Sequence, residues 1–585
     1  MTRRTRAWAA GVLALTLGLS TACGGEANND DNNTDPAKAE FNAALTKVFN
    51  ASDKTGGTMK IANAGDWDSL DPGETYYGYA WNFARLYGRS LLTWKTEPGE
   101  AGNELVPDLA EGLGEPSEGG KTWTYKIRKG VLYEDGTEVK AADVKHAVLR
   151  STDKATFPNG PAYFEGYLNL PAGYKGPYKS KGVNTDSAIE TPDDYTIVFH
   201  LKAPFGGFDY FAHMPQTMPV PAAKDTGAKY RQHVISTGPY MFEKNEQGKS
   251  FTLVRNPKWS KDTDPLRKAL PDRYEVSLKV NAEDLDNRLL SGDLHLDVVG
   301  GGVQAASLSK VLPKPDVKAQ ADNPGSARLW YTSITPQVAP LDNIECRKAI
   351  MYAADRVGYQ TAFGGEFAGG DIATTLLPPV IPGHEKFDLY PVGGDNKGDV
   401  AKAKEALTKC GQPNGFATGI AYRAERPKEK ALAESLQQSL SRVGIKLTPK
   451  PFPQGDYFSQ YAGNPPYVRT NKIGLAVNGW QADWNDGFGF LSQIVDSRVI
   501  RETGGSSNVS VRIPEVDQLL DKAIAETDAA KREPIWTEID KRVMEEAVIL
   551  PGVYAKSLLV RGKGLTNVFV NQAYGQYDYL SLGLQ

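Results

Sequence analysis

The sequence has few of the residues that support metal binding or covalent catalysis. Among its 585 residues there are only three cysteines and six histidines. No two histidines have the helical spacing of a zinc site, no cysteines have the close spacing of a redox or zinc motif, and no Gly-x-Ser-x-Gly elbow is present. We therefore predict no catalytic residue, no metal and no cofactor, and we interpret the histidines as structural.

A large excess of charge is also missing. The net charge is −4, charged residues make up 24% of the chain and apolar residues 40%. This balance gives no basic surface for nucleic acid and is typical of a globular protein. Because the chain is too long for one ordinary domain, we expect two or three domains, in a monomer without a nucleic-acid partner.

No hydrophobic run long enough to span a bilayer follows the N-terminal region. That region has three arginines, a short apolar run and a cysteine after small residues, at Arg3, Arg4, Arg6, Ala7 to Leu19 and Ser20 to Cys23. Such a pattern is typical of bacterial lipoprotein signals, whose cysteine is lipidated. We predict that residues 1–23 form this signal and that Cys23 anchors the protein to the outer face of the cell membrane. A soluble secreted protein cut near Ala22 is the alternative.

The residues after the signal have little apolar surface to bury. Residues 24–35 are almost entirely Gly, Asn, Asp and Glu, which predicts a flexible tether. Between Lys38 and Phe49 the apolar spacing indicates a short helix that lies against the body of the protein. We assign residues 24–55 to this tether and helix.

Two cysteines remain after the lipidation site, Cys346 and Cys410. In an exported protein an even remainder favours one disulfide. The bond would close a loop of about 65 residues and stabilise the fold by roughly 4 kcal/mol. We interpret it as a structural link.

The stretch from Gly479 to Leu491 combines two tryptophans with an isolated acid. Trp480 and Trp484 flank Asp483, and a carboxylate desolvated between apolar rings needs a cation such as a ligand ammonium. The alternative is a strand end whose tryptophans belong to the core and whose Asp483 and Asp486 form a turn. The segment alone does not decide between these two interpretations.

A second region predicts a strand, a turn and a helix in succession. The strand begins at Lys121, the turn lies at Asp135-Gly136 and the helix runs from Lys140 to Arg150. This order resembles a signature of the family 5 extracellular solute-binding proteins, the peptide- and nickel-binding receptors of ABC importers. Five further stretches are similar to that family in order and spacing: Gly57 to Pro72, Ser236 to Trp259, Leu341 to Arg356, Gly479 to Leu491 and Ile513 to Pro551. The resemblance covers roughly residues 56–585.

The resemblance implies an α/β, two-lobed periplasmic-binding-protein-like fold of class II, in its large type, with a ligand cleft that closes by hinge motion. Lobe one would comprise residues 56–325, with an extra subdomain at about 91–235. Lobe two would comprise residues 326–553, and residues 554–585 would return to lobe one. Gly- and Pro-rich turns from Pro158 to Gly182 are expected to be exposed loops.

The resemblance also implies roles for residues at the cleft. In peptide-binding members an acid in a Trp-x-Ala-Asp motif pairs with the ligand's ammonium, which implies that role for Asp483. Gly479 and Gln481 would offer main-chain N–H and C=O groups, and Trp480 would wall the cleft. Further candidate ligand-binding residues are Trp484, Tyr76 and Tyr77.

One position departs from the family's pattern. Some oligopeptide receptors have an arginine six residues before the acid, where this chain has Val477. A ligand carboxylate would then be bound elsewhere or not at all. Arg328, Arg423 and Arg426 are conceivable partners, but arginines are usually exposed, so we assign none of them.

Together these features predict an extracytoplasmic receptor that captures peptides and delivers them to a membrane permease with its ATPase subunits. Other cargoes remain as alternatives, namely a nickel chelate, a siderophore-like compound, an opine or a glycan, because Trp480 and Trp484 also suit sugar stacking. The alternative of another class is an exported hydrolase, because the separation of paired catalytic carboxylates is spatial.

Overall fold

A computed structural model describes residues 40–157, 160–424, 426–453 and 456–585. The chain divides into a unit from Met1 to Lys38 and a compact unit from Ala39 to Gln585. The predicted signal, Cys23 and most of the predicted tether lie outside the described residues. Within them, every helix is too short or too polar to cross a membrane.

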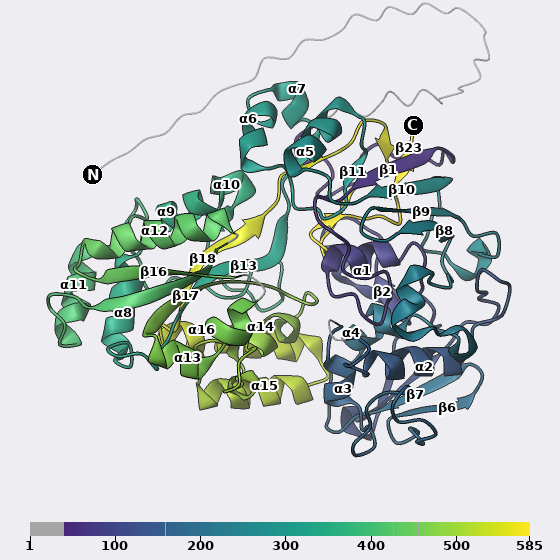
Figure 1. The fold of residues 1–585 in the computed structure, drawn as a ribbon, viewed down its shortest axis with the longest axis horizontal. Coiled ribbons are helices and arrows are strands. Elements are labelled where there is room, and N and C mark those ends of the chain that lie inside the picture. Colours follow the sequence, from purple (N-terminus) through teal and green to yellow (C-terminus); the bar gives the residue numbers. More distant parts are fainter. Residues whose placement is uncertain (1–39, 158–159, 425, 454–455) are drawn as a thin grey trace, which may run out of the picture. The chain divides into compact units, whose positions relative to one another are not determined.

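Lobe one is built on a five-stranded sheet in the order β11-β1-β10-β9-β8 (Figure 1). The strands are β1 (Thr58–Ala62), β8 (Tyr240–Glu246), β9 (Ser250–Arg255), β10 (Arg273–Ser277) and β11 (Leu296–Asp297). β1 is parallel to β10 and β11, whereas β8, β9 and β10 are antiparallel. In β1, Met59 and Ile61 are buried while Lys60 is exposed, as the period of a strand requires. Helices α1 (Gly78–Ala84) and α5 (Ala282–Ser291) belong to this lobe.

A separate antiparallel sheet, in the order β4-β5-β7-β6, forms within the predicted extra subdomain. The elements of this subdomain are β4 (Glu115–Ser117), β5 (Thr122–Lys126), α2 (Ala141–Ser151), α3 (Tyr163–Tyr167), β6 (Ile189–Asp193), β7 (Thr196–His200) and α4 (Asp209–Ala212). A further strand pair is formed by β2 (Leu92–Trp94) and β3 (Leu105–Pro107). The predicted strand, turn and helix between Lys121 and Arg150 are confirmed. The N–H groups of Thr237 and Gly238 donate to Tyr87 O at 2.9 and 3.0 Å. The chain therefore enters and leaves the extra subdomain at neighbouring positions.

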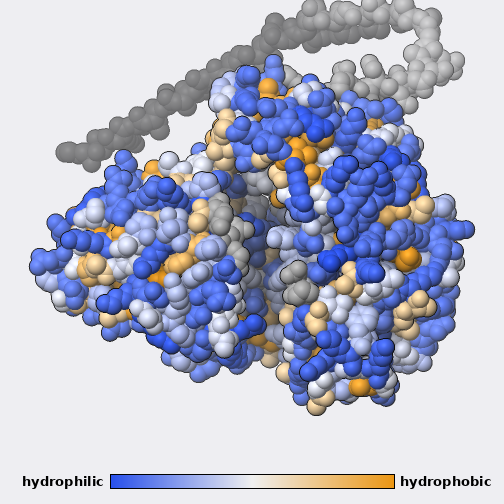
Figure 2. Space-filling model, in the orientation of Figure 1, coloured by the Kyte–Doolittle hydropathy of each residue, from blue (hydrophilic) through white to orange (hydrophobic). Residues whose placement is uncertain are grey.

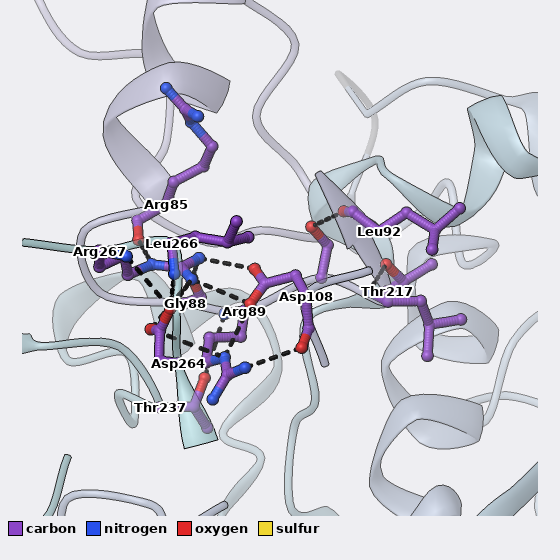
Figure 3. A network of polar contacts seen from close by, with 12 residues as sticks. Arg85, Gly88, Arg89, Leu92, Asp108, Thr217, Thr237, Asp264, Leu266 and Arg267 are labelled. Carbon is purple, nitrogen blue, oxygen red and sulfur yellow. Dashed lines mark hydrogen bonds and ion pairs between the residues drawn. The ribbon is translucent and has the colours of Figure 1, made fainter. Parts of the chain in front are cut away.

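Buried ion pairs fasten this junction to lobe one (Figure 3). Arg89 Nε donates to Asp108 Oδ1 at 2.8 Å, and Arg267 Nη2 donates to Asp108 Oδ2 at 2.6 Å. Arg267 also pairs with Asp264 at 3.1 Å. Burial alone would raise the pKa of Asp108, but Arg267 and Arg89 hold it below its ordinary value. Because each charge has a partner, these charges tolerate burial.

Lobe two contains a six-stranded mixed sheet in the order β14-β18-β13-β17-β15-β16. The strands are β13 (Gly325–Ile334), β14 (Gly370–Ile372), β15 (Ala417–Arg423), β16 (Lys446–Phe452), β17 (Ile473–Gln481) and β18 (Ile549–Lys556). In Figure 1, α9 and α12 lie on one side of this sheet and α14, α15 and α16 on the other. The helices are α8 (Ile344–Ala353), α9 (Arg356–Phe363), α10 (Gly365–Ala368), α11 (Val400–Lys409), α12 (Pro427–Ser441), α13 (Pro465–Thr470), α14 (Gly487–Val495), α15 (Pro514–Ala525) and α16 (Ala529–Glu545). The α/β prediction is confirmed.

The predicted disulfide between Cys346 and Cys410 is confirmed. The first cysteine lies in α8 and the second caps the C-terminus of α11. Their Cα atoms are 5.4 Å apart, a usual separation for a disulfide. The bond joins two neighbouring helices of lobe two.

The chain crosses between the lobes twice, between β12 (Ala321–Asp322) and β13 and between β18 and β19 (Leu559–Val560). β12 pairs with β19, so the two crossings lie side by side. The short C-terminal strands are β20 (Leu565–Thr566), β21 (Val570–Asn571), β22 (Gln576–Tyr577) and β23 (Gly583–Leu584). Leu565, Val570 and Tyr577 share a core with Met59 and Ile61 of β1. The C-terminal segment therefore packs on lobe one.

The helix predicted between Lys38 and Phe49 is wrong for the part that is described. Turns and bends occupy residues 41–47, and Asn42 has a φ of 65°, which interrupts a helix. The N–H of Asn42 donates to Ala321 O at 3.0 Å, and the N–H of Ala44 donates to Asp322 Oδ1 at 2.9 Å. These tertiary hydrogen bonds replace intrahelical ones.

Candidate ligand-binding site

The carboxyl end of β17 carries the candidate site. Gln481 lies opposite Arg328 of β13, and Gly479 lies opposite Trp330. One residue further, the N–H of Ala482 donates to Ala327 O at 2.9 Å. Because hydrogen-bonded and non-bonded pairs alternate along an antiparallel ladder, the N–H and C=O groups of Gly479 and Gln481 point away from β13.

The edge toward which these groups point is open. On that side β15 pairs with β17 only between Ile473 and Ala476, and the carbonyl of Val477 accepts a hydrogen bond from Tyr457 OH at 2.9 Å. Within the described ranges, nothing on this edge bonds to the main-chain groups of Gly479 and Gln481. An extended chain can therefore add here as a strand.

Both Gly479 and Trp480 are half-buried. A Cβ atom at position 479 would lie 2.3 Å from the ring of Trp330, so only glycine fits without moving that ring. Trp480 packs against the core, and its indole Nε1 is buried with no acceptor among the described residues. A buried donor of this kind normally has a partner.

Asp483 is held by two hydroxyl groups of lobe one. Tyr76 OH donates to Asp483 Oδ2 at 3.1 Å, and Tyr163 OH donates to the same oxygen. Burial raises the pKa of Asp483 to about 6, although the hydrogen bonds from Tyr163 and Tyr76 act in the opposite direction. No lysine, arginine or histidine in the described part of the chain forms a side-chain hydrogen bond with it, and none acts on its pKa. The carboxylate is therefore desolvated without a cation.

The residues that follow Asp483 are structural. Trp484 is 1% exposed and packs against Tyr163, Tyr210 and Phe211, with ring centroids 5.0, 5.7 and 5.7 Å away. Asp486 caps α14 by accepting a hydrogen bond from the N–H of Phe488 at 2.9 Å. Trp484 thus has no surface for a ligand in this structure, which corrects its candidate role. The core interpretation therefore holds for Trp484.

The two candidate tyrosines lie in the loop before α1. Tyr76 stacks on Trp81 with centroids 6.0 Å apart and is 36% exposed, while Tyr77 is 57% exposed. The N–H of Tyr76 donates to Asp68 Oδ2 at 2.8 Å. This bond holds the loop so that the hydroxyl of Tyr76 meets Asp483.

Three arginines near the end of β17 influence one another, Arg328 on β13 and Arg423 and Arg426 at the end of β15 and just after it. Arg328 Nε donates to Gln481 Oε1 at 3.2 Å. Burial and repulsion from Arg426 and Arg423 lower the pKa of Arg328 to about 10. Arg423 is 6% exposed and pairs with Glu429. Exposure was the expected state of all three arginines; this is wrong, since Arg328 and Arg426 are half-buried.

Tyr163 is not among the residues predicted for the site. It lies in the stretch from Pro158 to Gly182 that was expected to form exposed loops, but it begins α3 and is 7% exposed. The available signal was the spacing of Tyr163, Phe164 and Tyr167, which suits one face of a helical turn. Gly and Pro on both sides obscured it.

Nothing in the described ranges indicates a metal centre, since no three His, Cys, Asp or Glu side chains are grouped to hold an ion. His213, one of the histidines interpreted as structural, is 5% exposed, and burial lowers its pKa to about 4. It is neutral at physiological pH and packs against Trp81 and Trp94.

Aromatic contacts join the extra subdomain to lobe two beside the site. Phe205 meets Phe488 at 5.2 Å between centroids, and the N–H of Gly206 donates to Ile524 O at 2.9 Å. Figure 2 shows the surface hollowed between the two parts. The hydrogen bonds from Tyr76 and Tyr163 of lobe one to Asp483 of lobe two are therefore contacts between facing lobes.

Comparisons with known proteins agree with this architecture. Residues 104–501 match the family described as bacterial extracellular solute-binding proteins, family 5 Middle. The solved structure of clavulanic acid biosynthesis oligopeptide binding protein 2 is 41% identical, with a TM-score of 0.90, over 93% of this chain and 98% of that one. Heme-binding protein A of Haemophilus influenzae is 26% identical over 77% of this chain and 78% of its own length. The probable D,D-dipeptide-binding periplasmic protein DdpA of Escherichia coli strain K12 is 24% identical over 84% of this chain and 87% of its own length.

Proposed function

Since the chain belongs to the family 5 bacterial extracellular solute-binding proteins, we propose that it is the receptor of an ABC importer that captures peptides between its two lobes and delivers them to a membrane permease. The oligopeptide- and dipeptide-binding relatives support a peptide cargo. On this proposal Cys23 carries a lipid that keeps the monomeric receptor at the outer face of the cell membrane.

The observation that carries the proposal is the position of Asp483 at the end of an open strand edge. A peptide has an ammonium that fits a desolvated carboxylate, and its main chain fits the free N–H and C=O groups of Gly479 and Gln481. Both features are common to all peptides. The attraction between a carboxylate and an ammonium is far stronger in a closed cleft than in water.

One arginine near the end of β17 suits the other end of a peptide. Arg328 lies opposite Gln481, two residues before Asp483, and no carboxylate in the described part of the chain bonds to it or raises its pKa. A planar guanidinium binds a carboxylate through two parallel hydrogen bonds. On this proposal Arg328 binds the ligand carboxylate, which the apolar side chain of Val477 is unable to do.

We expect Arg328→Gln to weaken binding of a free tripeptide by about tenfold, because a hydrogen bond to a charged group contributes about 1.5 kcal/mol or more. The same variant should bind the C-terminally amidated tripeptide as wild type does. Isothermal titration calorimetry measures both affinities. Arg469→Gln, which removes an arginine that is 43% exposed, is the charge-matched control. An equal loss with both peptides would contradict a carboxylate role.

We expect Gln481→Pro to bind peptides about fivefold more weakly than Gln481→Ala, because proline also removes the N–H that faces the ligand, at about 1 kcal/mol. This N–H does not take part in the ladder with β13, so proline is tolerated at the edge. The alanine variant controls for the loss of the side chain. Equal affinities of the two variants in calorimetry would argue against strand-like binding.

Thermal shifts with a ligand panel test the function as a whole. Free peptides should raise the melting temperature, whereas N-acetylated peptides and oligosaccharides should not, because a ligand that binds only the folded state stabilises it. Stabilisation by oligosaccharides alone would favour a glycan receptor. Peptide cleavage products in mass spectrometry would favour the exported hydrolase instead.

A further inference from the structure

A cavity of about 520 Å³ opens in lobe one at the carboxyl ends of the parallel strands β1 and β11. Its lining includes Asp66, Asp68, Asp286, Asp297, Tyr77 and Val299. In α/β sheets, ligands bind at the carboxyl ends of parallel strands. The volume is sufficient for a long side chain, since pockets for whole small ligands begin at about 300 Å³.

The charge of the cavity wall is entirely negative. Four of the residues that line it are aspartates, and none is lysine, arginine or histidine. Asp66 pairs with Lys279 at 2.8 Å. Asp68 and Asp297 instead accept hydrogen bonds from neutral groups, the former from Thr75 OH and the N–H of Tyr76 and the latter from the N–H groups of Val299 and Gly301. Burial raises the pKa of Asp297 to about 6, as expected where no cation is near.

Asp286 gives a second, independent indication of a ligand. The residue is 2% exposed, and its Oδ2 accepts a hydrogen bond from the N–H of Gln304 at 2.9 Å. No donor in the described ranges reaches Oδ1, although the side chain lines the cavity. A buried carboxylate with one free oxygen beside an open space has the chemistry of a cation acceptor.

Apolar surface gathers at the same cavity. Tyr77 is 57% exposed and Val299 39% exposed, and both belong to the lining together with Tyr79. An aromatic face attracts a cation, and apolar surface packs against the methylene stem of a long basic side chain. Carboxylates and exposed aromatic rings together therefore suit an alkyl guanidinium or ammonium better than a compact metal ion.

The cavity lies next to the proposed ammonium site. Asp68, in its wall, accepts a hydrogen bond from the N–H of Tyr76, whose hydroxyl donates to Asp483. Tyr77, the next residue, lines the cavity itself. One short loop thus connects both sites.

We infer that this cavity binds the cationic side chain of a peptide ligand, so that the receptor prefers peptides with arginine or lysine near the N-terminus. The inference rests on the proposed function, because it places that side chain beside an ammonium held by Asp483. Asp286 and Asp297 contact the cation, while Tyr77 and Val299 pack against its stem.

Calorimetry with alanine-based tripeptides tests the inference, with arginine or its neutral analogue citrulline at the first or second position. At one of these two positions, wild type should bind the arginine peptide about tenfold more tightly than the citrulline peptide, because hydrogen bonds to charged partners are stronger than those to neutral ones. In Asp286→Asn and Asp297→Asn this ratio should fall toward one. Asp284→Asn removes an equal charge from an exposed position on the same helix and should keep the ratio. Melting temperatures of the unliganded variants verify folding.

Equal affinity of wild type for arginine and citrulline peptides would overturn the inference while leaving peptide binding intact. A preference that survives in both aspartate variants would overturn it as well. If no peptide binds, the proposed function fails, and n-butylguanidinium alone then tests the cavity. A thermal shift with this probe that is lost in Asp286→Asn but kept in Asp284→Asn would support the cation site, and no shift in any form would reject it.

Discussion

Asp483→Ala should weaken binding of free peptides at least tenfold at pH 7.5. Removal of one partner from a desolvated charge pair costs about 2 to 5 kcal/mol, much of it because the other charge is left unpaired. N-acetylated peptides, which have no ammonium, should bind wild type too weakly to shift its melting temperature, and the substitution should not weaken their binding further. Calorimetry with matched free and acetylated tripeptides measures the difference.

The same substitution should leave the unliganded protein at least as stable as wild type. Burial raises the pKa of Asp483 to about 6, above the value of about 3.9 in an unfolded chain. The folded state therefore binds the proton more readily, and this group lowers stability as the pH rises from about 4 to 6. Its removal relieves that cost at neutral pH, which a melting experiment detects.

Peptide affinity of wild type should depend on pH for the same reason. The ammonium needs the ionised carboxylate, so affinity should rise between pH 5 and 7 and then level off as Asp483 ionises around pH 6. Asp483→Asn should remove this rise. Glu538→Ala, at an exposed position of α16, controls for net charge. Wild-type affinity for free peptides in Asp483→Ala would contradict the ammonium role.

The double variant Cys346→Ala with Cys410→Ala should lose about 4 kcal/mol of unfolding free energy. The disulfide closes a loop with a sequence separation of 64 residues, and without it the unfolded chain regains the corresponding conformational entropy. Guanidinium denaturation monitored by tryptophan fluorescence measures the change. Alanine suits position 346 because that side chain is fully buried and serine would bury a hydroxyl group.

Peptide affinity should remain unchanged in this double variant, because the bond joins α8 to α11 and neither helix contributes to the open edge of β17. Cys346→Ala alone provides a control, since it breaks the bond but leaves one thiol. Unfolding free energies equal to that of wild type would show that the packing of the two helices suffices without the link.

The sequence alone determined those features that depend on neighbouring residues or on order along the chain. The strand, turn and helix between Lys121 and Arg150 follow from local periodicity, and the disulfide follows from the count of cysteines in an exported protein. The ordered motifs gave the family and the α/β fold, because several separate matches rarely coincide. The two alternative interpretations of the stretch from Gly479 to Leu491 were also visible, but not which of its residues are enclosed by other side chains.

Tertiary structure decided what faces each of these residues. Trp484 and Asp483 are adjacent in sequence, yet one is enclosed by aromatic rings and the other meets Tyr76 and Tyr163. The segment from Asn42 to Ala44 has helical apolar spacing but bonds instead to residues 321–322, because hydrogen bonds to distant groups compete with local ones. The open edge and the acidic cavity both depend on strand register, which brings together residues hundreds of positions apart. Periodicity determines which residues are apolar or polar together, whereas burial and the presence of a counter-charge depend on chain segments that no local pattern specifies.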